Sequence, residues 1–138
     1  MTWLFDTSLI SEVDKPRPNP GVVAWLQSNR EPAYLSVITI GEIQSGIERL
    51  PRTARRHALV SRIEEILVEF HDRILTVTTA VSLEWGTLTG STIAAGRTLP
   101  ILDSFIAATA LVHNLTVVTQ NVADFEACGV PTFSPWTG

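Results

Sequence analysis

The chain has 138 residues, of which 45% are apolar and 17% charged, and its mean hydropathy is positive. This composition excludes intrinsic disorder, and the length predicts one domain, residues 1–138, with a sizeable core. The net charge of −4 excludes a nucleic-acid-binding surface that is basic throughout.

Membrane and disulfide signals are also missing from the sequence. No apolar run approaches the roughly 18 residues that cross a bilayer, and the N-terminus lacks a basic region followed by an apolar one. The single cysteine, Cys128, has no partner for an internal disulfide and cannot form a metal cluster alone. We therefore expect a cytoplasmic protein that does not act at a membrane.

Apolar runs and helical spacings divide the chain into alternating strands and helices. The first strand, Trp3–Phe5, stops at Asp6, and a helix follows it. Later strands are predicted at Ala33–Ile38, Ile74–Val77 and Leu115–Thr119, followed by short segments at Asn121–Phe125 and Val130–Phe133. Later helices are predicted at Val22–Ser28, Thr39–Leu50, Pro51–Phe70, Thr78–Ala95 and Pro100–His113.

The predicted strands are continuous apolar runs, as in a sheet that is covered on both faces. Strands of this kind that alternate with helices are typical of parallel sheets. The sequence therefore predicts an α/β fold, a three-layer α/β/α sandwich around a mainly parallel sheet of four to five strands.

Four acidic residues lie just after a strand or in the early part of a helix. Asp6 ends the first strand, Glu42 and Asp124 follow later strands, and Asp103 lies at the start of a helix. In a parallel sheet these side chains reach one edge, where their mutual repulsion favours a bound cation. Oxygen ligands suit Mg²⁺ or Mn²⁺, and such an ion can promote hydrolysis of a phosphodiester.

Each of these acids also has a purely structural interpretation. Thr39 is predicted as a helix N-cap with Glu42 in its capping box, and a carboxylate such as Asp103 is favoured in any first helical turn. Asp124 is alternatively a loop residue in an Asx turn. Asp6 is harder to explain in this way, because it directly follows a buried strand and needs a partner. Glu12 and Asp14 are predicted to lie on the outer side of the first helix.

Hydroxyl side chains near these acids have two interpretations as well. They either cap helices and turns or orient a carboxylate or a water, and the candidates are Thr7, Ser8, Ser36 and Thr119. Five of the ten basic residues fall within fourteen positions, at the end of one predicted helix and in the next, namely Arg49, Arg52, Arg55, Arg56 and Arg62. They either bind RNA or an acidic protein, or form ion pairs on a solvated helix face with Glu48, Glu64 and Glu65.

Three segments of the chain together resemble PIN-domain ribonucleases, and more narrowly the VapC-type toxins of bacterial toxin–antitoxin modules, including the FitB-like branch. The segments are LFDTSLISEVDKPRPNPGVVAWL, LSVITIGEIQSGIERLP and LPILDSFIAATALVHNLTVVTQNVADF. The resemblance implies a PIN-like fold and a Mg²⁺- or Mn²⁺-dependent endoribonuclease. It assigns the metal ligands to Asp6, Glu42 and Asp103.

The family's fourth motif corresponds to residues 119–125 and departs from the common pattern. Asn121 stands where many members have an aspartate, which implies that Asp124 is the fourth catalytic carboxylate. Thr119 and Asn121 are then supporting residues, as is Thr7, which is expected to hold the Asp6 carboxylate or a water. Ser8 replaces a frequent asparagine and Gln120 a frequent arginine.

The resemblance also implies partners. These toxins are typically homodimers held inactive by a VapB-type antitoxin, and the helical hairpin Thr39–Phe70 is the expected clamp for an antitoxin segment. Arg49, Arg52, Arg55 and Arg56 then reach for antitoxin carboxylates or for the RNA backbone. The alternative function is a catalytically silent protein-interaction module on the same fold.

Overall fold

A parallel sheet lies at the centre of the molecule in the computed structural model, which describes residues 2–137. Within these residues five strands pair in the order β3-β2-β1-β4-β5, and all four pairings are parallel. The parallel sheet predicted from the apolar runs is thus confirmed, and the short C-terminal segment forms its fifth strand. The strands are β1 (Trp3–Phe5), β2 (Ala33–Ser36), β3 (Ile74–Leu75), β4 (Thr116–Val118) and β5 (Thr132–Phe133).

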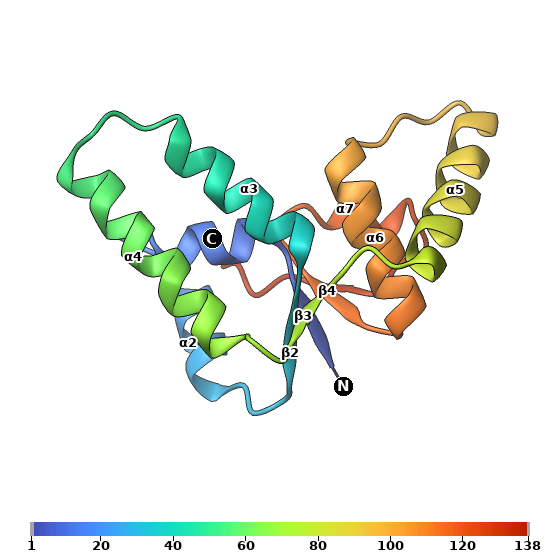
Figure 1. The fold of residues 1–138 in the computed structure, drawn as a ribbon. Helices are drawn as coiled ribbons and strands as arrows, with labels where there is room; N and C mark the ends of the chain where they lie inside the picture. The colour runs from blue at the N-terminus through green and yellow to red at the C-terminus, as the bar shows by residue number, and fades with distance from the viewer. Residues whose placement is uncertain (1, 138) are drawn as a thin grey trace.

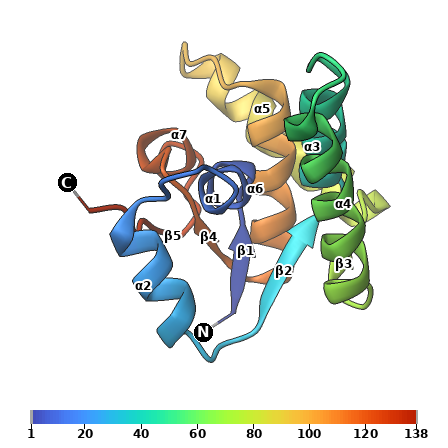
Figure 2. The same cartoon turned by 90° about the vertical axis from the view of Figure 1, so that its left-hand side faces the viewer.

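Helices cover both faces of this sheet, as Figures 1 and 2 show. The helices are α1 (Thr7–Val13), α2 (Pro20–Ser28), α3 (Val37–Glu48), α4 (Ala54–Glu69), α5 (Thr79–Ala94), α6 (Ile101–His113) and α7 (Val122–Glu126). One hydrophobic cluster joins the sheet to α1–α4, and the other joins it to α5–α7. The three-layer α/β/α sandwich is confirmed.

Strand β1 shows why the sheet needs cover on both sides. Its residues alternate, so that Trp3 and Phe5 enter the cluster with α1–α4, whereas Leu4 enters the cluster with α5–α7. All three are buried. Burial of each such side chain stabilises the fold by about 1.5–3 kcal/mol. This fixes the end of β1, and with it the position of Asp6, in the middle of the sheet.

Helix α3 begins earlier than the sequence suggested. Ser36 is its N-cap and accepts a hydrogen bond from the N–H of Ile38 at 3.1 Å, so the prediction of Thr39 as the cap was wrong. Strand β2 therefore ends two residues sooner, and Glu42 lies in the second turn of α3. The capping-box interpretation of Glu42 fails for the same reason. Helix α4 also begins at Ala54 and not at Pro51.

Glu12 is buried, so the prediction that it lies on the outer side of the first helix was wrong. Its side chain accepts hydrogen bonds from Lys15 Nζ, the Asn19 N–H and Trp136 Nε1 at 3.0–3.2 Å. The Lys15 bond lowers the pKa of Glu12 most, followed by the bonds from Asn19 and Trp136. Asp14 is also partly covered, and it forms an ion pair with Arg62. The periodicity of the helix does not reveal that Glu12 is buried, because its partner Trp136 lies far along the chain.

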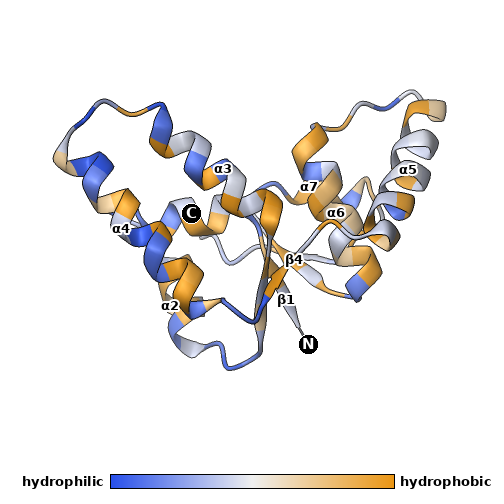
Figure 3. Cartoon of the chain, viewed as in Figure 1, coloured by the Kyte–Doolittle hydropathy of each residue, from blue (hydrophilic) through white to orange (hydrophobic). Residues whose placement is uncertain are grey.

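The helices form two arms above the sheet, α3 with α4 and α5 with α6 (Figure 1). Hydrophilic residues gather where α3 connects to α4 (Figure 3), at the position of the predicted arginine cluster. Across residues 2–137, no helix has the length and apolarity to cross a membrane.

Candidate active site

The fold brings the four predicted acids to the carboxyl edge of the sheet. Asp6 follows β1 as the N-cap residue of α1, and Glu42 lies in α3, which begins where β2 ends. Asp103 is in the first turn of α6, and Asp124 is in the first turn of α7, after β4. The parallel register explains the convergence, because successive crossover connections return each strand's end to the same edge.

The pKa of Asp103 is raised in part by the charges of the other three carboxylates. Burial, and then the charges of Asp6, Glu42 and Asp124, raise its pKa to about 6 from an ordinary value of 3.8. A carboxylate that loses water and faces like charges holds its proton more tightly. The predicted clustering of the four acids is therefore visible in the electrostatics of this site.

Asp6 is almost completely buried, with 2% of its surface exposed, and its partners are hydroxyl groups. Ser8 Oγ and Thr119 Oγ1 both donate to Asp6 Oδ2, at 3.0 and 2.8 Å. Its own N–H donates to the carbonyl of Val118 at 3.0 Å. The expectation that Asp6 is nearly buried and needs partners is confirmed.

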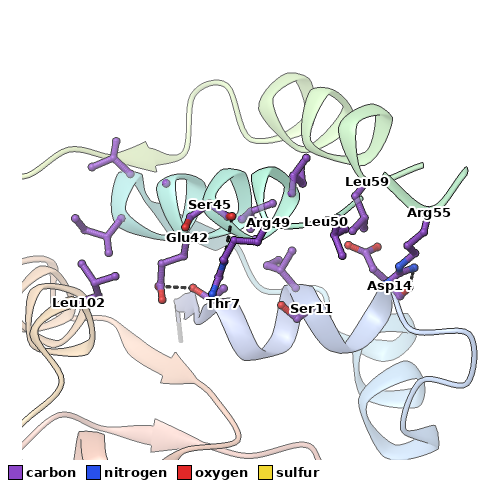
Figure 4. A pocket seen from close by; sticks show the side chains of 17 residues that line it. Thr7, Ser11, Asp14, Glu42, Ser45, Arg49, Leu50, Arg55, Leu59 and Leu102 are labelled. Carbon is purple, nitrogen blue, oxygen red and sulfur yellow. Dashed lines mark hydrogen bonds between the residues drawn. The ribbon is translucent and has the colours of Figure 1, made fainter. Parts of the chain in front are cut away.

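Glu42 is held by a different hydroxyl. Thr7 Oγ1 donates to Glu42 Oε1 at 2.7 Å, across the gap between α1 and α3 (Figure 4). Thr7 therefore bonds to Glu42. The sequence had instead suggested that Thr7 holds the Asp6 carboxylate or a water. Each of these two acids is oriented by a hydroxyl from an element that the sequence places far away.

The chemistry of these side chains fits a hard divalent cation. All candidate ligands are carboxylate oxygens, the donors that Mg²⁺ and Mn²⁺ prefer. A cation would also relieve the repulsion that raises the pKa of Asp103. Among residues 2–137, no three His, Cys, Asp or Glu side chains converge closely enough to enclose an ion. Asp6 and Glu42 are instead held by the hydroxyls described above, so binding an ion requires side-chain adjustment.

Asp124 and Asn121 lie on the exposed side of the site. Asp124 is in helix α7, so the alternative of a loop Asx turn is not what the structure shows. Asn121 occupies the N-cap position of α7, and its N–H donates to Thr119 Oγ1 at 2.9 Å. Thr119 is therefore bonded both to Asp6 and to the segment that carries Asp124. The catalytic roles of these residues remain predictions.

The arginine cluster divides between internal contacts and solvent. Arg55 donates to the Asp14 carbonyl at 2.8 Å, and Arg56 pairs with Glu48 at 3.2 Å. Arg49 donates to the carbonyl of Ser45 in its own helix at 3.2 Å, and Arg52 is exposed. Some of the predicted ion pairs thus form, including Arg62 with Glu65 at 3.5 Å.

A groove of about 810 Å³ is lined by one of the four acids, Glu42, and by two of these arginines, Arg49 and Arg55. It runs between α1, α3 and α4, with Thr7, Glu42 and Leu102 near one end and Arg55 near the other (Figure 4). Most of its wall is apolar, formed by Ile10, Val37, Ile38, Ile43, Ile47, Leu50 and Leu59. The helical hairpin was predicted from the sequence, whereas the contribution of α1 to the groove was not. Gly41 and Gly46, five residues apart on α3, were the available signal, because they leave the groove open.

Comparison with known proteins places this geometry in a family. Residues 3–128 match the PIN domain. Toxin FitB of Neisseria gonorrhoeae is 38% identical over 135 residues, which cover 96% of this chain and 97% of FitB. VapC ribonuclease Y4jK of Sinorhizobium fredii is 33% identical, with 96% of each chain covered.

A solved structure extends the similarity to three dimensions. The structure of FitAB bound to a DNA fragment superposes on this fold with a TM-score of 0.91. The matched chain is 37% identical, and the match covers 99% of this chain and 96% of that one. The chain therefore belongs to the PIN-domain family, in the group that contains toxin FitB and the VapC ribonucleases.

Proposed function

We propose that this protein is an endoribonuclease that depends on Mg²⁺ or Mn²⁺ and acts as the toxin of a toxin–antitoxin pair. The observation that carries the proposal is the cluster of four carboxylates, in which three neighbours help to raise the pKa of Asp103 to about 6. The names of the relatives, a toxin and a VapC ribonuclease, agree with this chemistry.

We assign binding of the ion to Asp6, Glu42 and Asp103. A bound divalent ion supplies Lewis-acid stabilisation of the charge that develops on a phosphodiester and favours ionisation of the attacking water. Thr7 keeps the Glu42 carboxylate turned toward the groove through its 2.7 Å hydrogen bond. We assign Asp124 the role of general base, because it is exposed and close enough to affect Asp103.

The proposal is tested by following cleavage of a fluorophore-labelled RNA by the purified protein. Cleavage is expected with Mg²⁺ or Mn²⁺, and it should stop in EDTA. Asp6→Asn and Asp103→Asn should each lower the rate by at least about 100-fold, since each removes a charged ligand. Asp72→Asn is the matched control, because Asp72 is an exposed acid in the connection between α4 and β3, where it pairs with Arg73 at 3.6 Å.

Two results would contradict the proposal. Cleavage that survives both substitutions at the wild-type rate would show that the acids are not the catalytic centre. An absence of cleavage together with no change in thermal stability on adding Mn²⁺ would favour the silent interaction module instead.

We propose further that the groove binds a segment of a VapB-type antitoxin in the cytoplasm. The groove combines apolar walls with the Glu42 carboxylate near one end and Arg55 near the other, and Arg49 lies between them beside Ser45 (Figure 4). These features suit an amphipathic peptide with a basic group near Glu42 and an acidic one near Arg55. Gly41→Leu should obstruct the groove and abolish rescue of growth by a co-expressed candidate antitoxin of the VapB type, whereas Gly86→Leu on α5 should not.

We also propose that the protein forms a homodimer. Among the described residues, several large apolar side chains are exposed on α5 and α6, namely Leu83, Ile93, Ile101, Leu102 and Val112. Exposed apolar surface of this kind on one arm favours association with a second copy.

A further inference from the structure

In the hydrogen bonds of Asp6 with Ser8 and Thr119, the hydroxyl groups are the donors and the carboxylate is the acceptor. Ionised Asp6 only accepts hydrogen bonds, so Ser8 and Thr119 must both use their single hydroxyl proton toward Oδ2. Each hydroxyl oxygen in turn accepts a backbone N–H. Gln120 donates to Ser8 Oγ at 3.2 Å, and Asn121 donates to Thr119 Oγ1 at 2.9 Å.

This arrangement leaves the two oxygens of Asp6 unequal. Oδ2 accepts two hydrogen bonds, whereas no side chain or N–H in the described part of the chain donates to Oδ1. Every fully buried side-chain oxygen among these residues has a partner. Oδ1 therefore keeps contact with solvent, although Asp6 as a whole is only 2% exposed.

The same bonds connect two parts of the site. Gln120 and Asn121 form the connection between β4 and α7, and α7 carries Asp124. Through Ser8 and Thr119 the backbone of this connection is bonded to the carboxylate that ends β1. A change at either hydroxyl should therefore alter both the orientation of Asp6 and the placement of α7.

We propose that Ser8 and Thr119 act as positioning residues, a hydroxyl clamp that offers only Asp6 Oδ1 to a cation and thereby selects against Ca²⁺. The proposal rests on the proposed metal-dependent function. Mg²⁺ and Mn²⁺ accept a carboxylate through a single oxygen in octahedral geometry, whereas Ca²⁺ tolerates higher coordination and often takes both oxygens of one carboxylate. With both lone pairs of Oδ2 engaged by donors, two-oxygen binding by Asp6 requires breaking at least one of these hydrogen bonds.

The clamp is tested first in the metal-free protein by amide hydrogen exchange, measured by NMR. Ser8→Ala should speed exchange of the Gln120 N–H, and Thr119→Val should speed exchange of the Asn121 N–H. Ser8→Thr keeps the hydroxyl and should preserve protection. Ser91→Ala is the matched control, because its hydroxyl bonds only within α5. Unchanged exchange at Gln120 in Ser8→Ala and at Asn121 in Thr119→Val would overturn the clamp.

Selectivity is tested by titrating the same proteins with Mn²⁺ and with Ca²⁺ in a calorimeter. Ser8→Ala and Thr119→Val should lower Mn²⁺ affinity by roughly 10-fold and change Ca²⁺ affinity less, so that the Mn²⁺/Ca²⁺ ratio falls. An unchanged ratio in both variants would overturn the selectivity. If the wild-type protein binds neither ion, the proposed function itself fails, and the exchange experiment still decides whether the clamp exists.

Discussion

Asp6 and Asp103 belong to the same group of acids but differ in their hydrogen bonds. Asp6 is more deeply buried than Asp103, yet it accepts hydrogen bonds from Ser8 and Thr119. No described residue donates a hydrogen bond to Asp103, and burial together with the neighbouring charges raises its pKa to about 6. Hydrogen bonds stabilise a carboxylate's charge, whereas burial without them penalises it. Asp103 is therefore the acid that most needs a cation.

The raised pKa of Asp103 predicts a pH dependence of stability in the metal-free protein. Between about pH 4 and pH 6 the folded state binds a proton at Asp103 that the unfolded state has already released. This group's contribution to the free energy of unfolding is therefore greatest at low pH and falls as pH rises through about 6. Asp103→Asn should remove this loss and raise the melting temperature at pH 7.5.

Thermal unfolding in EDTA at several pH values checks this prediction. The difference in melting temperature between Asp103→Asn and the wild type should grow from pH 4 to pH 7. Asp72→Asn is the control, since this exposed acid faces Arg73 and not a cluster of carboxylates. If the difference in melting temperature between the wild type and Asp103→Asn is the same at every pH, the pKa of Asp103 is not raised and the prediction is contradicted.

Among the elements, the C-terminal segment shows how a short piece of chain is fixed in place. Asn19 caps α2, and its Oδ1 also accepts from the N–H of Thr137 while its Nδ2 donates to the Thr137 carbonyl. Glu12, in α1, accepts a hydrogen bond from Trp136 Nε1 at 3.2 Å. The segment after β5 is thus bonded to α1 and α2, which lie on the same face of the sheet.

Gly21 makes this contact possible, because the segment passes directly over it. A Cβ added there would lie 2.6 Å from the Pro135 carbonyl oxygen and 2.5 Å from the Thr137 side chain. Gly21→Ala should therefore destabilise the protein by about 1–3 kcal/mol, as overpacking does. Gly86→Ala, in α5 with nothing within 4 Å, should stabilise it by about 0.5–1 kcal/mol. Urea unfolding measures both, and equal effects of the two substitutions would contradict the contact.

At the scale of the whole molecule, the two arms differ in their exposed surface. The arm of α3 and α4 carries the arginines and one wall of the groove, and α4 also exposes Val60, Leu67 and Val68. The helices α5 and α6 contain no arginine and expose five large apolar side chains, those named above for the proposed dimer. On α5, Leu83 is 69% exposed and Ile93 is 72% exposed. The two arms therefore suit different partners, an antitoxin segment on one and a second copy on the other.

The proposed homodimer predicts an asymmetric response to charged substitutions. Ile93→Glu on α5 should convert the dimer to a monomer, because a charge would be buried against the second copy. Val68→Glu on α4 should leave the dimer intact, although Val68 is 74% exposed and thus a matched site. Light scattering coupled to size-exclusion chromatography measures the mass. A monomeric wild type, or a dimeric Ile93→Glu variant, would contradict this interface.

The sequence by itself determined the layered fold and the membership of the acid cluster. Continuous apolar strands that alternate with helices have few alternatives to a parallel sheet, because only burial on both faces accommodates them. Parallel strands then send their carboxyl ends to one edge, so the positions of Asp6, Glu42, Asp103 and Asp124 relative to the strands were enough to predict that all four lie at that edge. Boundaries were less certain, as Ser36 and Thr39 show, since both are acceptable N-caps and only packing chooses between them.

Tertiary structure alone decided which group each acid contacts. The bond from Thr7 to Glu42 and the bond from Thr119 to Asp6 join residues 35 and 113 positions apart, and no local spacing encodes them. The burial of Glu12 beneath Trp136 depends in the same way on a distant part of the chain. Periodicity reports which face of a helix is apolar, whereas the partner of a polar side chain depends on which elements the sheet brings together.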